Sequence, residues 1–334
     1  MQSALGTNRR RRKITTYLAV SAVLIILAGM AVKGILTVSC HQTAPIMIVE
    51  RNSGKLIRES VMGDAALRFA YETLLGRSLW GILFHSSAFS DMMGLYYDSP
   101  LSRKSIRKLA EIPGCLPDEA ELPISQYHSF NDFFTRKLKA GARPFDAGPD
   151  LLVSPADGRI MVYQGLKANE PIPVKGAVKT LEDLCCGKLP FETAAVAVIR
   201  LAPVDYHRYH FPCSCEQSAP TRIVKGKYHS VNPVALARRP DLYVENTRHI
   251  TALHSEKFGS FYYLEVGAFG VGSIIQSAAP GSHEKMDEKG FFKFGGSTVI
   301  LIFDDRKIQW ADDLLNASLQ NHETLIKCGA VLSR

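Results

Sequence analysis

Hydrophobic and polar positions follow three different patterns along the 334-residue chain. Residues 17–32 are apolar without interruption, a pattern typical of a membrane-spanning or targeting segment. Residues 61–95 carry apolar side chains at helical spacing, which predicts amphipathic helices. From Leu151 onward, short apolar runs alternate with glycine and proline turns, which favours antiparallel strands. We therefore predict an α+β protein, with an N-terminal membrane anchor and helices followed by a mostly antiparallel, β-rich domain.

These patterns divide the chain into five parts. Residues 1–13 form a basic leader, 14–38 a transmembrane or targeting segment, and 39–60 a linker. Residues 61–125 form a helical region, and residues 126–334 form the β-rich region. Length alone would allow two folded domains, but a β-rich unit of this size is commonly one.

A helix is predicted to begin directly after Ser129. Asp132 stands at its third position, so the two side chains have the spacing of a capping box. Phe130, Phe133 and Phe134 follow on the same helix. We expect these aromatic rings to pack in the core rather than to form a lipid site.

The N-terminal segment is expected to hold the protein at a membrane. As a helix with 1.5 Å per residue, the apolar residues 17–32 would span about 24 Å, against roughly 30 Å for a bilayer interior. Lys33 can extend its amine toward the headgroups, so residues 34–38 lengthen the span. The small-residue pattern of a cleaved signal peptide is poor, which favours a retained helix. The expected location is the mitochondrial inner membrane in a eukaryote or the cytoplasmic membrane in a bacterium.

Charge is concentrated at the N-terminus. The formal net charge is +8, but Arg9–Arg12, Lys13 and Lys33 all precede the first acidic residue, Glu50, so the rest of the chain carries only +2. A nucleic-acid binder would keep its basic excess on the folded domain, so this class is excluded. The seven cysteines include the adjacent pair Cys185-Cys186 and form no obvious disulfide framework.

The stretch Gly295-Gly296-Ser297-Thr298 carries the most informative chemistry of the chain. Glycine lowers the steric cost of a cramped backbone, so the hydroxyl of Ser297 can attack the carbonyl of Gly296. The amide becomes an ester, and elimination then cuts the chain and leaves dehydroalanine at the new N-terminus. Hydrolysis of the dehydroalanine, with loss of ammonia, gives a pyruvoyl group, a built-in ketone. Such a short motif is usually a flexible turn, so other residues must support this reaction.

Two further segments supply acid–base groups for such a serine. Asp157 lies at the tip of a turn between two strand-like runs, where an aspartate can also have a purely structural role. His207 and His210 stand with two tyrosines after an apolar run, and a histidine can accept a proton near neutral pH. Asp157, His210 and Ser297 are therefore a candidate base-activated nucleophile.

Six blocks of sequence, in this order, resemble the phosphatidylserine decarboxylases, in particular the branch with Phe-Gly-Gly-Ser-Thr at the cleavage site. One departure is Gly295, because the commonest family pattern has leucine or valine before Gly-Ser. The blocks comprise residues 130–138, 143–144, 154–158, 205–212, 266–268 with 271–274, and 295–298.

The resemblance implies a proenzyme that cleaves itself between Gly296 and Ser297, with a small chain of 38 residues, 297–334. Asp157 and His210 would form the charge relay that activates Ser297, and His207 would serve decarboxylation or substrate orientation. The cofactor would be covalent pyruvate derived from Ser297. It would form a Schiff base with phosphatidylserine and release carbon dioxide, which gives phosphatidylethanolamine. The β-rich region would then be the catalytic domain.

The resemblance also implies partners. The substrate would be phosphatidylserine in a membrane, and the large (β) and small (α) chains would stay associated after cleavage. A homodimer is compatible with this reading, and no metal or nucleic acid is expected.

Other readings of the same residues remain open. His207, His210, Cys213 and Cys215 are ligand types that suit zinc, but on a strand His210 would face away from the other three. Ser297 could belong to a membrane-anchored serine hydrolase, although no Gly-x-Ser-x-Gly elbow surrounds it. The last two alternatives are a pyruvoyl decarboxylase of another amino-acid-like amine and a non-enzymatic metal-binding module.

Overall fold

Two β-sheets form the body of the protein in the computed structural model, which describes residues 45–59, 87–172, 178–227, 229, 233–236, 240–270 and 274–333. Within these residues, eleven strands form a large sheet and three form a small one. All of them belong to one unit, Ala44–Gly63 with Leu83–Arg334.

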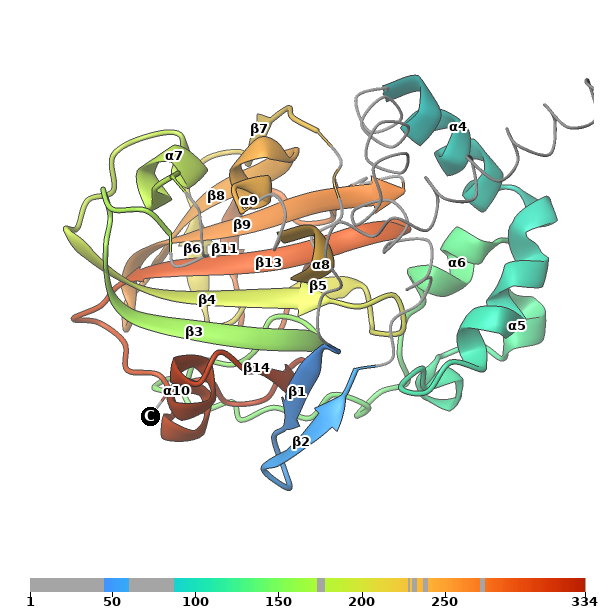
Figure 1. Ribbon diagram of the computed structural model, residues 1–334, viewed down its shortest axis with the longest axis horizontal. Helices are drawn as coiled ribbons and strands as arrows, with labels where there is room; N and C mark the ends of the chain where they lie inside the picture. The colour runs from blue at the N-terminus through green and yellow to red at the C-terminus, as the bar shows by residue number, and fades with distance from the viewer. Residues whose placement is uncertain are drawn as a thin grey trace, which may run out of the picture. The chain divides into compact units, whose positions relative to one another are not determined.

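The strands of the large sheet are β1 (Met47–Glu50), β2 (Lys55–Arg58), β3 (Gly158–Lys167), β4 (Thr193–Leu201), β6 (Cys215–Gln217), β7 (Arg222–Val224), β8 (Arg248–Ser255), β9 (Gly259–Gly270), β11 (Gly281–His283), β13 (Gly295–Asp304) and β14 (Glu323–Ile326). Their order is β11-β6-β8-β9-β13-β4-β3-β14-β1-β2, and β7 pairs with β8 (Figure 1). The small sheet contains β5 (Arg208–His210), β10 (Ile274–Gln276) and β12 (Glu288–Phe292), in the order β10-β12-β5. Among these described strands, only β1 and β14 pair in parallel.

The described helices are short and lie outside the sheets. They are α4 (Ser87–Asp98), α5 (Lys104–Ala110), α6 (Phe130–Phe134), α7 (Leu181–Cys185), α8 (Pro233–Leu236), α9 (Leu242–Glu245) and α10 (Asp312–Leu319), with the 3₁₀ helices η1 (Pro100–Arg103), η2 (Pro117–Glu119) and η3 (Ile124–Gln126). Figure 1 shows α4, α5 and α6 together at one end of the large sheet. The predicted α+β fold with a mostly antiparallel, β-rich domain is confirmed.

Strand β13 lies in the interior of the large sheet, antiparallel to β4 on one side and to β9 on the other. Val299, Leu301 and Phe303 pack into the core beneath the small sheet, whereas Ile300 and Ile302 pack into the core on the opposite face. Successive side chains of a strand point to opposite faces. A strand buried on both faces therefore reads as an unbroken apolar run, as residues 299–303 do.

Helix α6 begins where the sequence predicts it. The Ser129 side chain accepts a hydrogen bond from the Asp132 backbone N–H, which satisfies one of the free donors of the first turn. The three phenylalanines of the helix are fully buried. They form a separate aromatic core with residues of α5 and of the chain after β4, so the expectation of core packing is confirmed.

The hairpin of β1 and β2 lies in the segment expected to be a linker. Ile48 of β1 is buried, and Gly54 adopts a φ of +66° in the connecting turn, a conformation that glycine adopts at little cost. Strand β1 also pairs with β14. This part of the chain therefore belongs to the large sheet.

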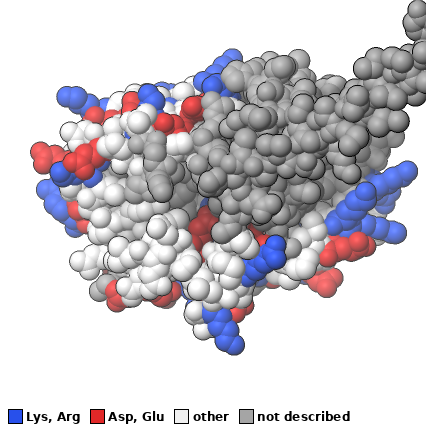
Figure 2. All heavy atoms as spheres, viewed as in Figure 1, with Lys and Arg blue, Asp and Glu red and all other residues white. Residues whose placement is uncertain are grey.

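The predicted leader, residues 1–13, and the predicted membrane segment, residues 14–38, lie outside the described residues, as does most of the helical pattern at 61–95. Where the structure is described, no helix has the length and apolar character needed to cross a bilayer. On the face in Figure 2, acidic and basic side chains are interspersed over the described surface. This distribution agrees with the small net charge of the chain after residue 49.

Candidate active site

Ser297 lies inside the large sheet, near the start of β13. It pairs with Leu201 of β4 and with Gly267 of β9, and its side chain is fully buried. Its Oγ has no hydrogen-bond partner among the described residues. Leaving a buried hydroxyl unpaired costs about 1–3 kcal/mol. Most buried polar groups in native structures are hydrogen-bonded, so an unpaired serine hydroxyl in this place is a candidate reacting group.

The peptide between Gly296 and Ser297 lies where regular strand pairing ends. Pairing with β4 stops at Ser297, and the register with β9 shifts between Ser297 and Gly295. Gly295 pairs with Gly270 at a φ of +148°. A residue with a Cβ rarely adopts this φ, so the conformation explains why glycine stands where the commonest family pattern has leucine or valine.

His207 is fully buried beside the aromatic core. Its Nδ1 lies 3.0 Å from the carbonyl oxygen of Asp205. Because a carbonyl can only accept, Nδ1 carries the proton and Nε2 holds the free electron pair. Nε2 has no hydrogen-bond partner among the described residues. The ring lies against that of Phe134, with a centroid distance of 3.8 Å and a tilt of 35° between the ring planes. Burial lowers the pKa of His207 to about 3, so the imidazole is neutral at physiological pH.

His210 is the last residue of β5 and has partners at both ring nitrogens. Its Nδ1 lies 3.0 Å from the Met286 carbonyl oxygen and therefore donates. Its Nε2 lies 3.3 Å from the Tyr206 hydroxyl. Burial raises the pKa of Tyr206, so this hydroxyl stays protonated and donates to Nε2. Burial also lowers the pKa of His210.

An open pocket of about 360 Å³ adjoins His210. Tyr206, Arg143 and Met286 line it together with His210. Lys137, Lys139 and Glu288 also face the pocket, and Leu138 and Phe145 add apolar surface. The pocket therefore brings the histidine next to both cationic and apolar side chains.

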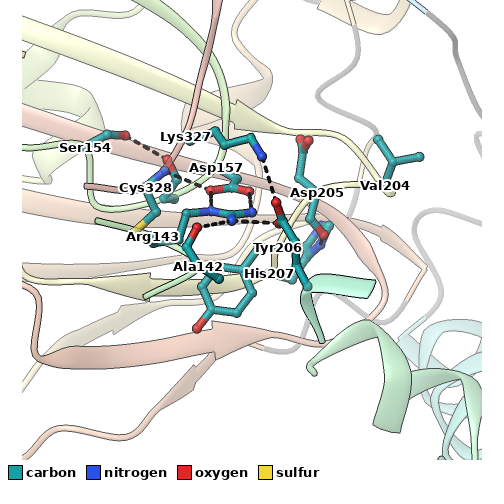
Figure 3. A network of polar contacts seen from close by, with 12 residues as sticks. Ala142, Arg143, Ser154, Asp157, Val204, Asp205, Tyr206, His207, Lys327 and Cys328 are labelled. Carbon is teal, nitrogen blue, oxygen red and sulfur yellow. Dashed lines mark hydrogen bonds and ion pairs between the residues drawn. The ribbon is translucent and has the colours of Figure 1, made fainter. Parts of the chain in front are cut away.

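Asp157 is saturated with donors (Figure 3). Its Oδ1 accepts from Arg143 Nε at 2.8 Å and from the Cys328 backbone N–H at 2.8 Å, and its Oδ2 accepts from the second Arg143 nitrogen at 2.5 Å. Gly158 follows because a Cβ there would lie 2.6 Å from the Arg200 carbonyl oxygen. The turn that carries Asp157 is thus packed tightly against β4.

Arg143 connects Asp157 to the surface. It also donates to Glu119, whose other oxygen accepts from Lys327 at 3.2 Å. Burial disfavours the charge of Arg143, but the hydrogen bonds and charges of Asp157 and Glu119 outweigh burial and raise its pKa. Glu119 is partly buried, which acts to raise its pKa. Its hydrogen bonds and ion pairs with Arg143 and Lys327 outweigh burial and lower this pKa. Arg143 and Glu119, the two groups between Lys327 and Asp157, are therefore both charged at neutral pH.

The structure places the three residues of the expected charge relay on three different elements. Asp157 is bonded to Arg143, His210 to Tyr206 and Met286, and the Ser297 hydroxyl to no described residue. The relay among the three side chains therefore stays a prediction. For the zinc alternative, no three His, Cys, Asp or Glu side chains in the described ranges are grouped as metal ligands would be.

Comparison with known proteins identifies the family. The family model described as phosphatidylserine decarboxylase matches residues 130–326. The chain belongs to the phosphatidylserine decarboxylase family. It is 38% identical over 297 residues to a phosphatidylserine decarboxylase proenzyme of Chlamydia muridarum, with 88% of this chain and 98% of that protein covered.

Two further relatives carry the same name. A phosphatidylserine decarboxylase proenzyme of Ruminiclostridium cellulolyticum is 37% identical over 291 residues, with 86% of this chain and 97% of the relative covered. One of Clostridium botulinum is 40% identical over 277 residues, with 81% and 93% covered. The resemblance inferred from the six sequence blocks is confirmed by these matches.

Several residues around this decarboxylase-family site had no role in the sequence analysis. Arg143 belongs to one of the six blocks, but its pairing with Asp157 could not be read from the spacing of the two residues. Tyr206 stands in the segment that carries His207 and His210. The high density of histidines and tyrosines in this segment was the only feature of the sequence that pointed to it. Glu119 gave no signal of its own.

Proposed function

We propose that this chain is a phosphatidylserine decarboxylase proenzyme that cuts itself between Gly296 and Ser297. One observation carries the proposal. The Ser297 hydroxyl is fully buried, has no hydrogen-bond partner among the described residues and directly follows two glycines at the end of regular strand pairing. Its attack on the Gly296 carbonyl converts the peptide to an ester, and elimination then separates the two chains.

In this proposal His210 accepts the proton of Ser297. The Met286 carbonyl holds the proton of His210 on Nδ1, which leaves Nε2 as the basic nitrogen. The Tyr206 hydroxyl occupies Nε2 in the uncleaved chain, so the serine proton must pass through this hydroxyl or displace it. Once His210 has accepted the proton it is a cation, and the negative charge of Asp157 favours this protonated form.

The surroundings of Ser297 also fit its conversion to a pyruvoyl group. Gly267 lies opposite Ser297 on β9, so no side chain projects from that position beside the reacting atoms. When present, a pyruvoyl ketone supplies an electron sink for the loss of a carboxylate from the substrate amine. His207, neutral and with a free electron pair on Nε2, would orient the substrate or return a proton to it.

The two chains are proposed to stay together after cleavage. The small chain would contain most of β13, from Ser297 onward, which is hydrogen-bonded to β4 and β9, and β14, which lies between β1 and β3. The Cys328 N–H of the small chain donates to Asp157 of the large chain. Separation would therefore break the interior of the large sheet.

We further propose that the enzyme acts on phosphatidylserine in a membrane, at the cytoplasmic membrane if the source is bacterial. The names and bacterial origins of the relatives support this assignment. The apolar residues 17–32 after the basic leader support attachment to a bilayer.

The proposal is tested on the purified full-length protein. Mass spectrometry under denaturing conditions should find two chains, the smaller of which comprises residues 297–334 and is blocked at its N-terminus. The cleaved protein should release carbon dioxide from phosphatidylserine in mixed micelles and not from free serine. A single intact chain, or release from free serine at the same rate, would overturn the proposal.

A further inference from the structure

The chain crosses from the small sheet to the large sheet immediately before the proposed cleavage site. Strand β12 ends at Phe292, which pairs with Ile274 of the small sheet. Pairing in the large sheet begins at Gly295. Only Lys293 and Phe294 lie between, so whatever holds these two residues also determines how the following glycines enter β13.

Three side-chain contacts hold the crossover. The Phe294 backbone N–H donates to Asn131 Oδ1 at 2.8 Å. Asn131 Nδ2 donates to Asp98 Oδ1 at 3.0 Å, and Lys293 Nζ donates to Asp98 Oδ2 at 2.8 Å. Because the carboxylate can only accept, it orients the Asn131 amide with its oxygen toward Phe294. We call Asn131, Asp98 and Lys293 the crossover clamp.

Asn131 is itself fixed. It lies in the first turn of α6 and is 2% exposed. The helix start is secured by the Ser129 cap and by a 2.9 Å hydrogen bond from the Phe130 N–H to the buried hydroxyl of Ser102. Asp98 ends α4. The clamp therefore ties the crossover to two helices rather than to a loop.

The Phe294 side chain reinforces this attachment. Its ring lies 4.5 Å from Tyr97, 4.9 Å from Phe130 and 5.3 Å from Phe134, measured between ring centroids. The Phe134 ring also contacts the ring of His207. The Phe134 ring thus contacts both Phe294, just before the proposed cleavage site, and His207 of the site.

The downstream side of the proposed cleavage site is held equally firmly, because Ser297 pairs with strands on both sides. Two glycines therefore bridge two fixed points, Phe294 and Ser297. The approach of the serine Oγ to the Gly296 carbonyl depends on this geometry, and a shift of about 1 Å can slow a reaction about 100-fold. We propose that Asn131 is a positioning residue for self-cleavage, acting through the crossover clamp. This inference rests on the proposed cleavage between Gly296 and Ser297.

The test measures the rate of chain cleavage in freshly translated full-length protein. Asn131→Ala should slow cleavage about ten-fold or more, since it removes both hydrogen bonds of the amide. Decarboxylase activity per pyruvoyl-bearing small chain, counted by mass spectrometry, should stay within about two-fold of wild type, because the clamp acts before the chain is cut. Asn316→Ala, on the exposed side of α10, is the matched control and should cleave at the wild-type rate.

A reciprocal exchange separates positioning from folding. Asn131→Asp alone places a second carboxylate against Asp98 and should slow cleavage. The double variant Asn131→Asp/Asp98→Asn restores an amide-to-carboxylate hydrogen bond with the roles exchanged, and should recover most of the cleavage rate. A purely structural loss in Asn131→Ala would instead lower activity per pyruvoyl group together with the cleavage rate, and that outcome would contradict the inference.

The outcomes distinguish the inference from the function on which it rests. If the wild-type chain stays whole, the proposed function fails. If the wild-type chain is cut and folded Asn131→Ala is cut at the same rate, only the inference fails. Should Asn131→Ala not fold, the partly exposed Asp98 provides a milder variant. Asp98→Ala should slow cleavage several-fold, and a wild-type rate there would equally overturn the inference.

Discussion

Two sets of buried polar atoms in this protein differ in how completely they are hydrogen-bonded. The Ser297 Oγ and the His207 Nε2 are fully buried and have no hydrogen-bond partner among the described residues. Around Asp157, by contrast, both carboxylate oxygens accept hydrogen bonds, and Arg143 joins the carboxylate to Glu119. Unpaired buried atoms reduce stability, whereas the paired ones hold their surroundings in place. We infer that the unpaired atoms are kept available for reaction and that the paired groups around Asp157 hold the surrounding chain in position.

The comparison is tested most severely at Ser297. Ser297→Ala removes the proposed nucleophile and should leave one uncut chain without decarboxylase activity, as seen by denaturing electrophoresis and carbon dioxide release. Ser282→Ala, at an exposed position of β11, is the control and should be processed normally. Normal cleavage of Ser297→Ala would disprove the self-cleavage mechanism.

The two histidines should separate the two reactions. His210→Ala should slow cleavage about 100-fold or more, because a positioned general base typically contributes a factor of that size. His207→Ala should be cut within about ten-fold of the wild-type rate, yet lose about 100-fold in decarboxylation per pyruvoyl group. Timed electrophoresis and substrate turnover measure the two effects. If His207→Ala blocks cleavage as fully as His210→Ala, the assigned division of roles is wrong.

The hydrogen-bonded groups around Asp157 should contribute more to the free energy of unfolding than the exposed end of the same network does. In the uncut Ser297→Ala background, Asp157→Ala should lower the free energy of unfolding by about 3 kcal/mol, because it leaves the buried Arg143 without its main partner. Urea unfolding measures this change. Lys327→Ala is the matched control at the exposed end of the same network, where Lys327 is 52% exposed, and should cost less than about 1 kcal/mol. Equal effects of the two variants would contradict the comparison.

The buried, unpaired imidazole of His207 should change how the free energy of unfolding depends on pH. The ordinary pKa of histidine is 6.5, and burial lowers the pKa of His207 to about 3. Below pH 6.5 the unfolded chain binds a proton that the folded chain takes up only near pH 3. The contribution of His207 to the free energy of unfolding is therefore complete above pH 6.5 and falls by about 1.4 kcal/mol per pH unit as the pH drops toward 3.

The variant His207→Gln isolates this contribution. In the Ser297→Ala background, it should make the free energy of unfolding fall less steeply between pH 6 and pH 4, by about 1.4 kcal/mol per pH unit. Urea unfolding at several pH values measures the slope. Identical slopes with and without the histidine would show that His207 takes up its proton equally well in the folded and unfolded chains.

The sequence predicted those features that depend on local patterns. The short apolar runs that alternate with glycine and proline turns after Leu151 predicted antiparallel strands, and the spacing of Ser129 and Asp132 predicted the start of α6. The glycines and serine at 295–297 were sufficient to suggest the reaction, and six sequence blocks were sufficient to place the chain in its family. These features report the burial of one element or the chemistry of a few adjacent residues, which periodicity and composition can express.

Only the tertiary structure decided which of these polar groups are bonded and to what. Asn131 and Phe294 are separated by 163 positions, and Arg143 meets Asp157 across a packed turn. The sequence assigned His210 to the relay and His207 to a separate role, but only the structure shows that their neighbours leave Nε2 free in His207 and occupied in His210. It also left Gly295 unexplained, until the entry into β13 showed a φ that glycine favours. Such pairings depend on how sheets and helices pack, and no local pattern in the sequence specifies that arrangement.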